Sequence, residues 1–109
     1  WTYSIRIRAI RELCPHRSVQ LTHRHWNIEQ NGDVEIVEGE AVVGHYPFFG
    51  PEEMQHNFVF VYQSASRGEG QTQMSGFFTF VPGTKDTPLG EPFEVQVAPF
   101  HLELPHYIY

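Results

Sequence analysis

The segment GEAVVG, which runs from Gly39 to Gly44, contains the residues best suited to contact a phosphate group. Glycines at close spacing let backbone N–H groups approach a phosphate. A dinucleotide-binding turn is, however, followed by a helix whose N-terminus meets the pyrophosphate, whereas here the segment HYPFFGP follows. We therefore interpret Gly39 and Gly44 as residues that bend a β-chain, and keep phosphate binding as the alternative.

A histidine pair offers a second kind of chemistry. His23 and His25 are two residues apart, so in a regular strand their side chains lie on the same face. Such a pair binds zinc or copper when a neighbouring strand adds a third ligand, and the candidates for that ligand are His45, His56 and His101. A chain with seven histidines also contains such a pair by chance. We therefore expect no metal and no other cofactor, with His23 and His25 as the candidate ligands if a metal binds.

The residues do not form a pattern typical of a catalytic centre. Cys14, the only cysteine, has His16 as a neighbour, but both lie in a predicted loop beside Pro15. The carboxylates between Glu29 and Glu53 alternate along strands as on a solvated face, and no serine or threonine occupies a nucleophile elbow. We therefore expect a protein that is not an enzyme. A single cysteine allows no internal disulfide, which favours an intracellular protein of the cytoplasm or nucleus.

The charge is divided unevenly along the chain, whose formal net charge is −6. Residues 1–24 contain five arginines and one acid, a net charge of +4, whereas residues 25–109 contain two bases and twelve acids, a net charge of −10. The overall sign argues against nucleic acid as a partner. The basic N-terminal part instead suits a small anion or a charged protein surface.

The length of 109 residues is that of one domain. No apolar run is long enough to span a membrane, so we expect no membrane contact. The sequence has no initiator methionine. We therefore expect residues 1–109 to be a single domain cut from a longer chain.

Apolar residues alternate with polar ones along most of the chain, which predicts β-strands. The expected strands cover 1–10, 19–29, 33–43, 58–62, 74–81, 93–97 and a short segment after Pro99. Asn31-Gly32 favours a hairpin turn, and a change of apolar parity between Leu21 and Trp26 predicts a bulge. With about seven strands and at most one helical turn, at 51–54, we expect an all-β antiparallel sandwich, with a small closed barrel as the alternative.

For two of the predicted strands, the sequence also indicates which side chains are buried. Trp26 shares its parity with Ile28, so we place it in the core. In the segment FVFVY (58–62), aromatic residues alternate with valines, which fits a strand with both faces covered.

Several short runs resemble, in their order and spacing, the ApaG domain family. The runs are RHW (Arg24–Trp26), NGDVEIVEGEAVVGHYP (Asn31–Pro47), FVYQS (Phe60–Ser64), MSGFFTF (Met74–Phe80) and FEVQVAPFHL (Phe93–Leu102). The resemblance covers nearly the whole chain and implies a β-sandwich of the fibronectin type III, immunoglobulin-like kind. The family's glycine motif has a glycine at the position of Ala41, and a side chain there obstructs a close approach of the backbone to phosphate.

The resemblance implies two classes of function. The loop PGTKDTPLGEP and the ending LELPHYIY are most similar to ApaG domains at the C-terminus of eukaryotic F-box proteins. In those proteins the domain is thought to select substrates of a ubiquitin ligase, which implies a non-catalytic domain that binds a ubiquitination substrate or a complex subunit. The alternative is a small-ligand sensor for pyrophosphate, a nucleotide or a divalent metal, as implied by the bacterial proteins linked to cobalt and magnesium tolerance.

We expect a protein partner to contact basic and aromatic residues, because arginine suits carboxylate or phosphate and aromatic loop residues are common in binding sites. If the first two strands are neighbours, their arginines converge on one patch. The candidate residues are Arg6, Arg8, Arg24, Tyr46, Phe48 and Phe49. For Phe48 and Phe49, the alternative is that they turn inward and close one end of the sandwich.

Overall fold

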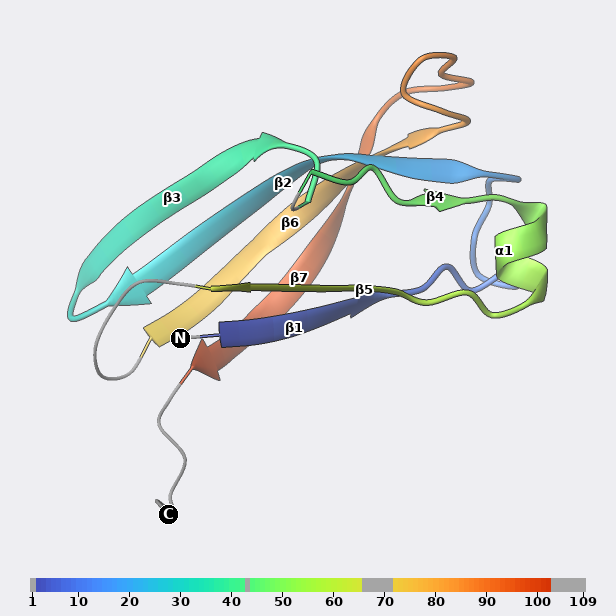
Figure 1. Cartoon of the computed structure of the whole chain (residues 1–109). Helices are drawn as coiled ribbons and strands as arrows, with labels where there is room; N and C mark the ends of the chain where they lie inside the picture. The colour runs from blue at the N-terminus through green and yellow to red at the C-terminus, as the bar shows by residue number, and fades with distance from the viewer. Residues whose placement is uncertain (1, 43, 66–71, 103–109) are drawn as a thin grey trace.

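The computed structural model describes residues 2–42, 44–65 and 72–102 of the chain (Figure 1). Within these ranges the strands are β1 (Thr2–Ile7), β2 (Val19–Gln30), β3 (Asp33–Glu40), β4 (Phe48–Phe49), β5 (Phe60–Ala65), β6 (Thr72–Pro82) and β7 (Phe93–Leu102). A short helix, α1 (Pro51–Gln55), confirms the helical turn predicted beside Pro51. The described residues contain no helix that is long and apolar enough to cross a membrane.

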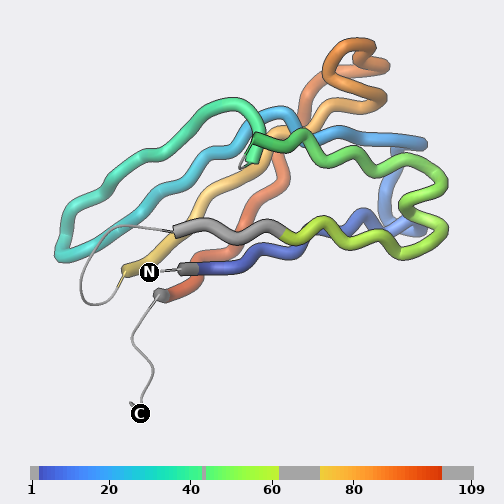
Figure 2. The backbone as a smooth tube through the Cα atoms, in the orientation of Figure 1, coloured from blue at the N-terminus to red at the C-terminus, as the bar shows by residue number. Residues whose placement is uncertain are grey.

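The strands form two antiparallel sheets. The large sheet has the order β3-β2-β6-β7, with β4 paired to one end of β2, and the small sheet consists of β1 and β5. β1 and β5 run side by side as a two-stranded ribbon (Figure 1), and Figure 2 shows the blue N-terminal segment alongside the yellow-green segment that leads from α1 into β5. This arrangement confirms the predicted all-β sandwich of the fibronectin type III kind.

The core between the sheets is built around Trp26, which is 2% exposed, as its parity predicted. Its ring makes edge-to-face contacts with Tyr3 of β1, at 6.2 Å between ring centroids, and with Phe78 and Phe100 of the large sheet, at 5.5 and 5.9 Å. Because Tyr3 lies in the small sheet and the other rings lie in the large one, this cluster joins the two layers.

The predicted bulge in β2 is present. The register between β2 and β6 shifts between Leu21 and His23, so Thr22 is the additional residue. Both Leu21 and Trp26 are buried although they are an odd number of residues apart, which a regular strand does not permit. The predicted hairpin is also present, because Asn31 (φ 52°) and Gly32 (φ 82°) join β2 to β3 in an antiparallel pair.

Several predicted boundaries were wrong. β1 ends at Ile7 and β3 at Glu40, earlier than expected. β4 lies in the segment HYPFFGP, whose aromatic residues were expected to lie in a loop. β7 continues through Pro99, where a break was predicted, because β7 is an edge strand and a proline on an edge need not donate a hydrogen bond to a neighbour.

Candidate functional site

Gly39 lies opposite Arg24 in the ladder between β3 and β2. The Arg24 guanidinium extends over Gly39, and its Nη1 donates hydrogen bonds to the carbonyl oxygens of Glu40 (2.9 Å) and Ala41 (3.0 Å). A Cβ built on Gly39 would lie 3.5 Å from Nη1 of Arg24, which is an ordinary contact. The segment GEAVVG therefore binds an arginine of its own chain through its carbonyl groups.

The remaining part of the segment forms a tight turn. Val42 and His45 exchange two backbone hydrogen bonds of 2.9 Å, and the N–H of Ala41 donates to the Thr22 carbonyl at 2.9 Å. Gly44 and Ala41 both have positive φ, at 78° and 67°. Two N–H groups of the segment, those of Ala41 and Val42, thus bond to backbone carbonyls, which leaves fewer of them to surround a phosphate.

The two candidate metal ligands have polar partners within the chain. Nδ1 of His23 is 2.9 Å from the Thr22 hydroxyl. Nδ1 of His25 is 2.8 Å from a carboxylate oxygen of Glu38, and the His25 ring stacks on Phe77 with 4.6 Å between the ring centroids. Within the described part of the chain, no three potential ligands lie close enough together to hold a metal ion.

The three candidate arginines do not converge on one patch. Arg6 and Arg8 lie at β1, which pairs with β5 rather than with β2. Arg24 lies in β2, in the other sheet, with its guanidinium bound to backbone carbonyls. The condition for convergence, that the first two strands are neighbours, was wrong because the first strand belongs to the small layer of the sandwich.

The three candidate aromatic residues have different environments. Phe49 is 1% exposed, and its ring is 5.9 Å from that of Phe58 and 6.4 Å from that of Phe80. The Phe49 side chain therefore points inward and belongs to the core, as the alternative to a binding role had it. Phe48 and Tyr46 are half-buried, so part of each side chain is accessible.

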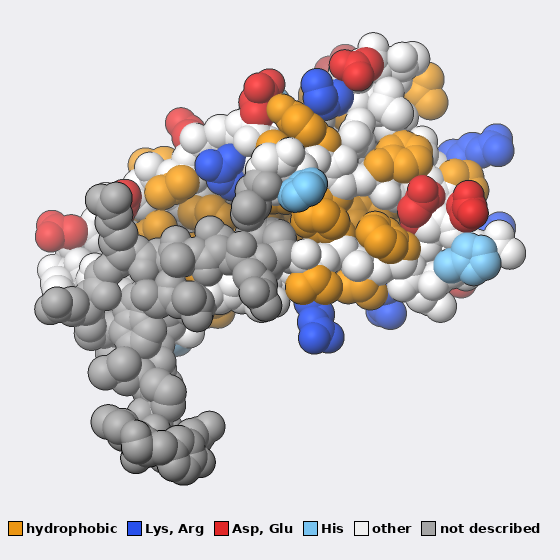
Figure 3. Space-filling view, in the orientation of Figure 1, with side chains coloured by type: hydrophobic (Ala, Val, Ile, Leu, Met, Phe, Trp, Pro, Cys, Tyr) orange, Lys and Arg blue, Asp and Glu red, His pale blue; other side chains and the backbone are white. Residues whose placement is uncertain are grey.

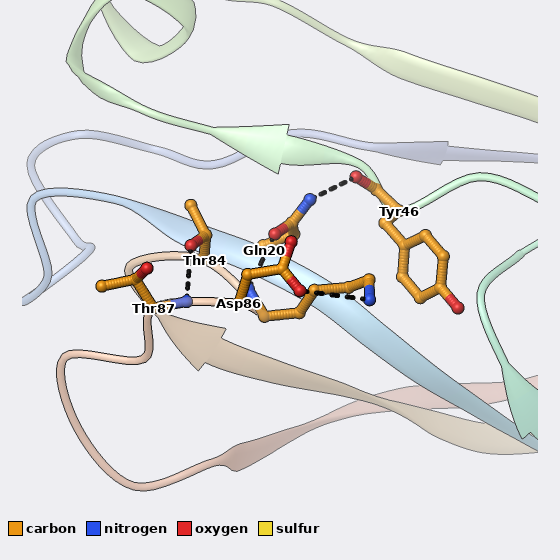
Figure 4. A network of polar contacts seen from close by, with 6 residues as sticks. Gln20, Tyr46, Thr84, Asp86 and Thr87 are labelled. Atoms are coloured by element: carbon orange, nitrogen blue, oxygen red, sulfur yellow. Dashed lines mark hydrogen bonds and ion pairs between the residues drawn. The ribbon is translucent and has the colours of Figure 1, made fainter.

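Tyr46 is held by a polar network around Gln20 (Figure 4). Nε2 of Gln20 donates to the Tyr46 carbonyl at 3.0 Å, and Oε1 of Gln20 accepts from the Lys85 backbone N–H at 2.9 Å. The Lys85 ammonium lies 4.7 Å from the centre of the Tyr46 ring. Through these contacts, the network connects the loop between β6 and β7 to the segment between β3 and β4.

The outer side of the β1–β5 ribbon combines positive charge with exposed aliphatic groups. We call Arg6, Arg8, Val59 and Val61 the ribbon face. Arg6 lies opposite Val61 in the ladder, Val59 and Val61 are 39% and 48% exposed, and both arginines are exposed. In Figure 3, hydrophobic side chains gather on the right of the molecule, with basic side chains along the lower border of that region.

The two valines of the ribbon face were not recognised as surface residues. The segment FVFVY was expected to have both faces covered, and this was wrong, because the small sheet has the large sheet on one side while Val61 on its other side is exposed. A strand that alternates two apolar residue types does not reveal from its sequence which face is covered. Only the number of layers in the fold settles it.

A groove of about 690 Å³ adjoins the ribbon face, between β1 and β7. Its apolar lining includes Ile5 and Ile7 of β1, Phe93 and Val97 of β7, and Phe80. Arg6 and Arg8 also line it. No signal in the sequence indicates this groove, because Ile5, Ile7, Phe93 and Val97 follow the alternation expected of core positions.

Residues 1–82 match the family model of the ApaG domain, and the chain belongs to that family. It is 42% identical to F-box protein SKIP16 of Arabidopsis thaliana, over 100% of this chain and 26% of that protein. It is 37% identical to Protein ApaG of Methylocella silvestris, over 96% of this chain and 72% of that protein. The chain thus spans about a quarter of the length of its F-box relative.

A solved structure has the same fold. The X-ray structure of Northeast Structural Genomics Consortium target SoR45 superposes on the chain with a TM-score of 0.75 at 27% sequence identity. The match covers 99% of this chain and 74% of that one. The ApaG domain is therefore found both in F-box proteins and in bacterial ApaG proteins, and this chain is similar to both kinds.

Proposed function

We propose that this chain is a non-catalytic protein-binding domain, and that in its parent protein it recruits a substrate to a ubiquitin ligase. The 42% identity to an F-box protein over the whole chain supports the second part. The first part rests on the ribbon face, where exposed valines lie beside two arginines.

The composition of the ribbon face suits a protein partner. Aliphatic groups that are desolvated on binding supply affinity, and arginine is enriched among the residues that dominate binding energy. Within the described residues, the guanidiniums of Arg6 and Arg8 form no ion pair with an acid. Both are thus able to bind carboxylate or phosphate groups of a partner through their planar donor fork.

The test reverses the two charges in Arg6→Glu with Arg8→Glu. Proteins captured by the chain from cells that express it are purified, and their association with wild type and double variant is measured by surface plasmon resonance at low and physiological salt. We expect slower association and a weaker salt dependence for the double variant, because surface charges mainly steer the encounter. Its melting temperature should stay unchanged, because both side chains are exposed.

A matched control separates the ribbon face from overall charge. Arg17→Glu reverses one exposed arginine outside the ribbon face and is compared with Arg6→Glu alone. Equal association rates for wild type and double variant at low salt would exclude the ribbon face as the binding surface. The role in ubiquitination is measured separately, as transfer of ubiquitin to the purified partner by the reconstituted ligase that contains the parent protein.

A further inference from the structure

Among the described strands, β3 forms one edge of the large sheet, at the end opposite to β7, and Figure 1 shows it as the outermost strand on its side. Native proteins usually protect a sheet edge with charged side chains, above all lysine, or with proline, a bulge or a short strand. The other edge follows this rule, because β7 contains Pro99 and its register with β6 is irregular. β3 is eight residues long, contains neither proline nor lysine, and pairs with β2 without a register shift. Its backbone geometry is therefore suited to accept another strand.

Two aliphatic side chains are exposed on this edge. Val34 and Ile36 are 59% and 58% exposed. Their cross-strand neighbours on β2 are Glu29 and Asn27, which are polar. Since cross-strand pairs are the main source of side-chain contact on a sheet face, Val34 and Ile36 lack an apolar partner across the ladder on that side.

The charges of β3 restrict which strand can be added. The exposed acids of this strand are Asp33, Glu35, Glu38 and Glu40. Like charges placed opposite one another destabilise a strand pair, and opposite charges stabilise it. Two copies of β3 would bring acids close to acids, so this edge disfavours a second copy of the chain and favours a basic strand.

We propose that the free edge of β3 binds an extended basic segment of a partner protein as an additional strand of the large sheet. The segment carries lysine or arginine that lie near the acids of β3, and aliphatic residues that pack on Val34 and Ile36. Main-chain hydrogen bonds to the edge supply affinity, and the alternating side chains supply specificity. This surface is separate from the ribbon face and has the opposite charge, so it does not depend on the function proposed above.

The test titrates the isotopically labelled 109-residue chain with three short synthetic peptides, followed by amide chemical shifts and hydrogen exchange. The first peptide alternates valine and lysine, the second alternates valine and glutamate, and the third alternates proline and lysine, so that it keeps the charge but cannot extend a ladder. We expect the valine–lysine peptide alone to bind, with shifts and slower exchange confined to β3 and the adjoining part of β2.

Two matched variants locate the site. Val34→Lys with Ile36→Lys places lysines on the β3 edge, and Val59→Lys with Val61→Lys adds the same charge on the ribbon face. All four residues are exposed, so both variants should fold. We expect the first variant to weaken binding of the valine–lysine peptide by at least about tenfold, and the second to change it by less than about threefold.

Three results would overturn the proposal. The first is absence of binding of the valine–lysine peptide at millimolar concentration. The second is equal binding of the proline–lysine peptide, which would mean attraction by charge alone. The third is an equal loss of affinity in both lysine variants, or chemical shifts centred outside β3. The function proposed for the ribbon face is tested separately, with variants of Arg6 and Arg8 and with another partner.

Discussion

Replacement of Gly44 by alanine tests whether the glycines of GEAVVG serve the backbone or a ligand. Gly44 has φ 78°, and a Cβ built on it would have no atom within 4 Å. The new methyl group therefore meets no obstacle, and the cost comes only from holding alanine in the left-handed region, about 1 kcal/mol or somewhat more. Gly39→Ala is the matched control, because its φ is not in that region and its Cβ would make an ordinary contact with Arg24.

The two variants should have different effects on the free energy of unfolding. Gly39 lies within β3, where a glycine is less stable than an alanine by about 0.5–1 kcal/mol, so Gly39→Ala should be neutral or slightly stabilising. Urea unfolding followed by tryptophan fluorescence measures both. With a denaturant slope of about 2 kcal/mol per molar, Gly44→Ala should lower the midpoint by about 0.5 M.

Calorimetry with pyrophosphate on the same two variants completes the test. Gly44→Ala should lower stability whether or not pyrophosphate binds. A Gly44→Ala protein that keeps the wild-type urea midpoint and loses a pyrophosphate affinity present in the wild type would refute a purely structural role for Gly44. The turn would then exist for the ligand, and the small-ligand function would replace the structural interpretation of Gly39 and Gly44.

Three further predictions concern the core and the fold. Gly76→Ala should prevent folding or lower the urea midpoint far more than Gly44→Ala, because a Cβ at Gly76 would overlap the backbone carbonyl of His25. A stable variant would show that β2 and β6 can separate at this position. Trp26→Ala should lower the free energy of unfolding by about 3–5 kcal/mol in urea titrations, since three rings pack on it, and an unchanged midpoint would contradict its burial. Far-UV circular dichroism should show well under about a fifth helix, because α1 is the only helix of the described residues.

Much of the large sheet was predictable because its signals are local. Alternation of apolar and polar residues identified most strands, and Asn31-Gly32 fixed the hairpin between β2 and β3. The shift in apolar parity predicted a bulge between Leu21 and Trp26, because a residue that leaves the ladder moves every later side chain to the other face, and the register of the structure identifies that residue as Thr22. The same parity argument placed Trp26 in the core.

The candidate site was less predictable, because its properties depend on which strands become neighbours. The sequence identified Arg6 and Arg8 as a basic pair but did not show that β5 lies beside them, more than fifty residues further along the chain. It offered Phe48 and Phe49 as equal candidates, and packing against Phe58 and Phe80 placed Phe49 alone in the core.

The sequence by itself determined the fold class, the β2–β3 hairpin and the family, because these follow from local periodicity, turn chemistry and the order of short runs. Tertiary structure alone decided that the first strand joins the small layer, which separates Arg24 from Arg6 and leaves Val61 exposed. The physical reason is that a strand specifies which of its faces is apolar, whereas its neighbours and the layer that covers it are set by long-range pairing.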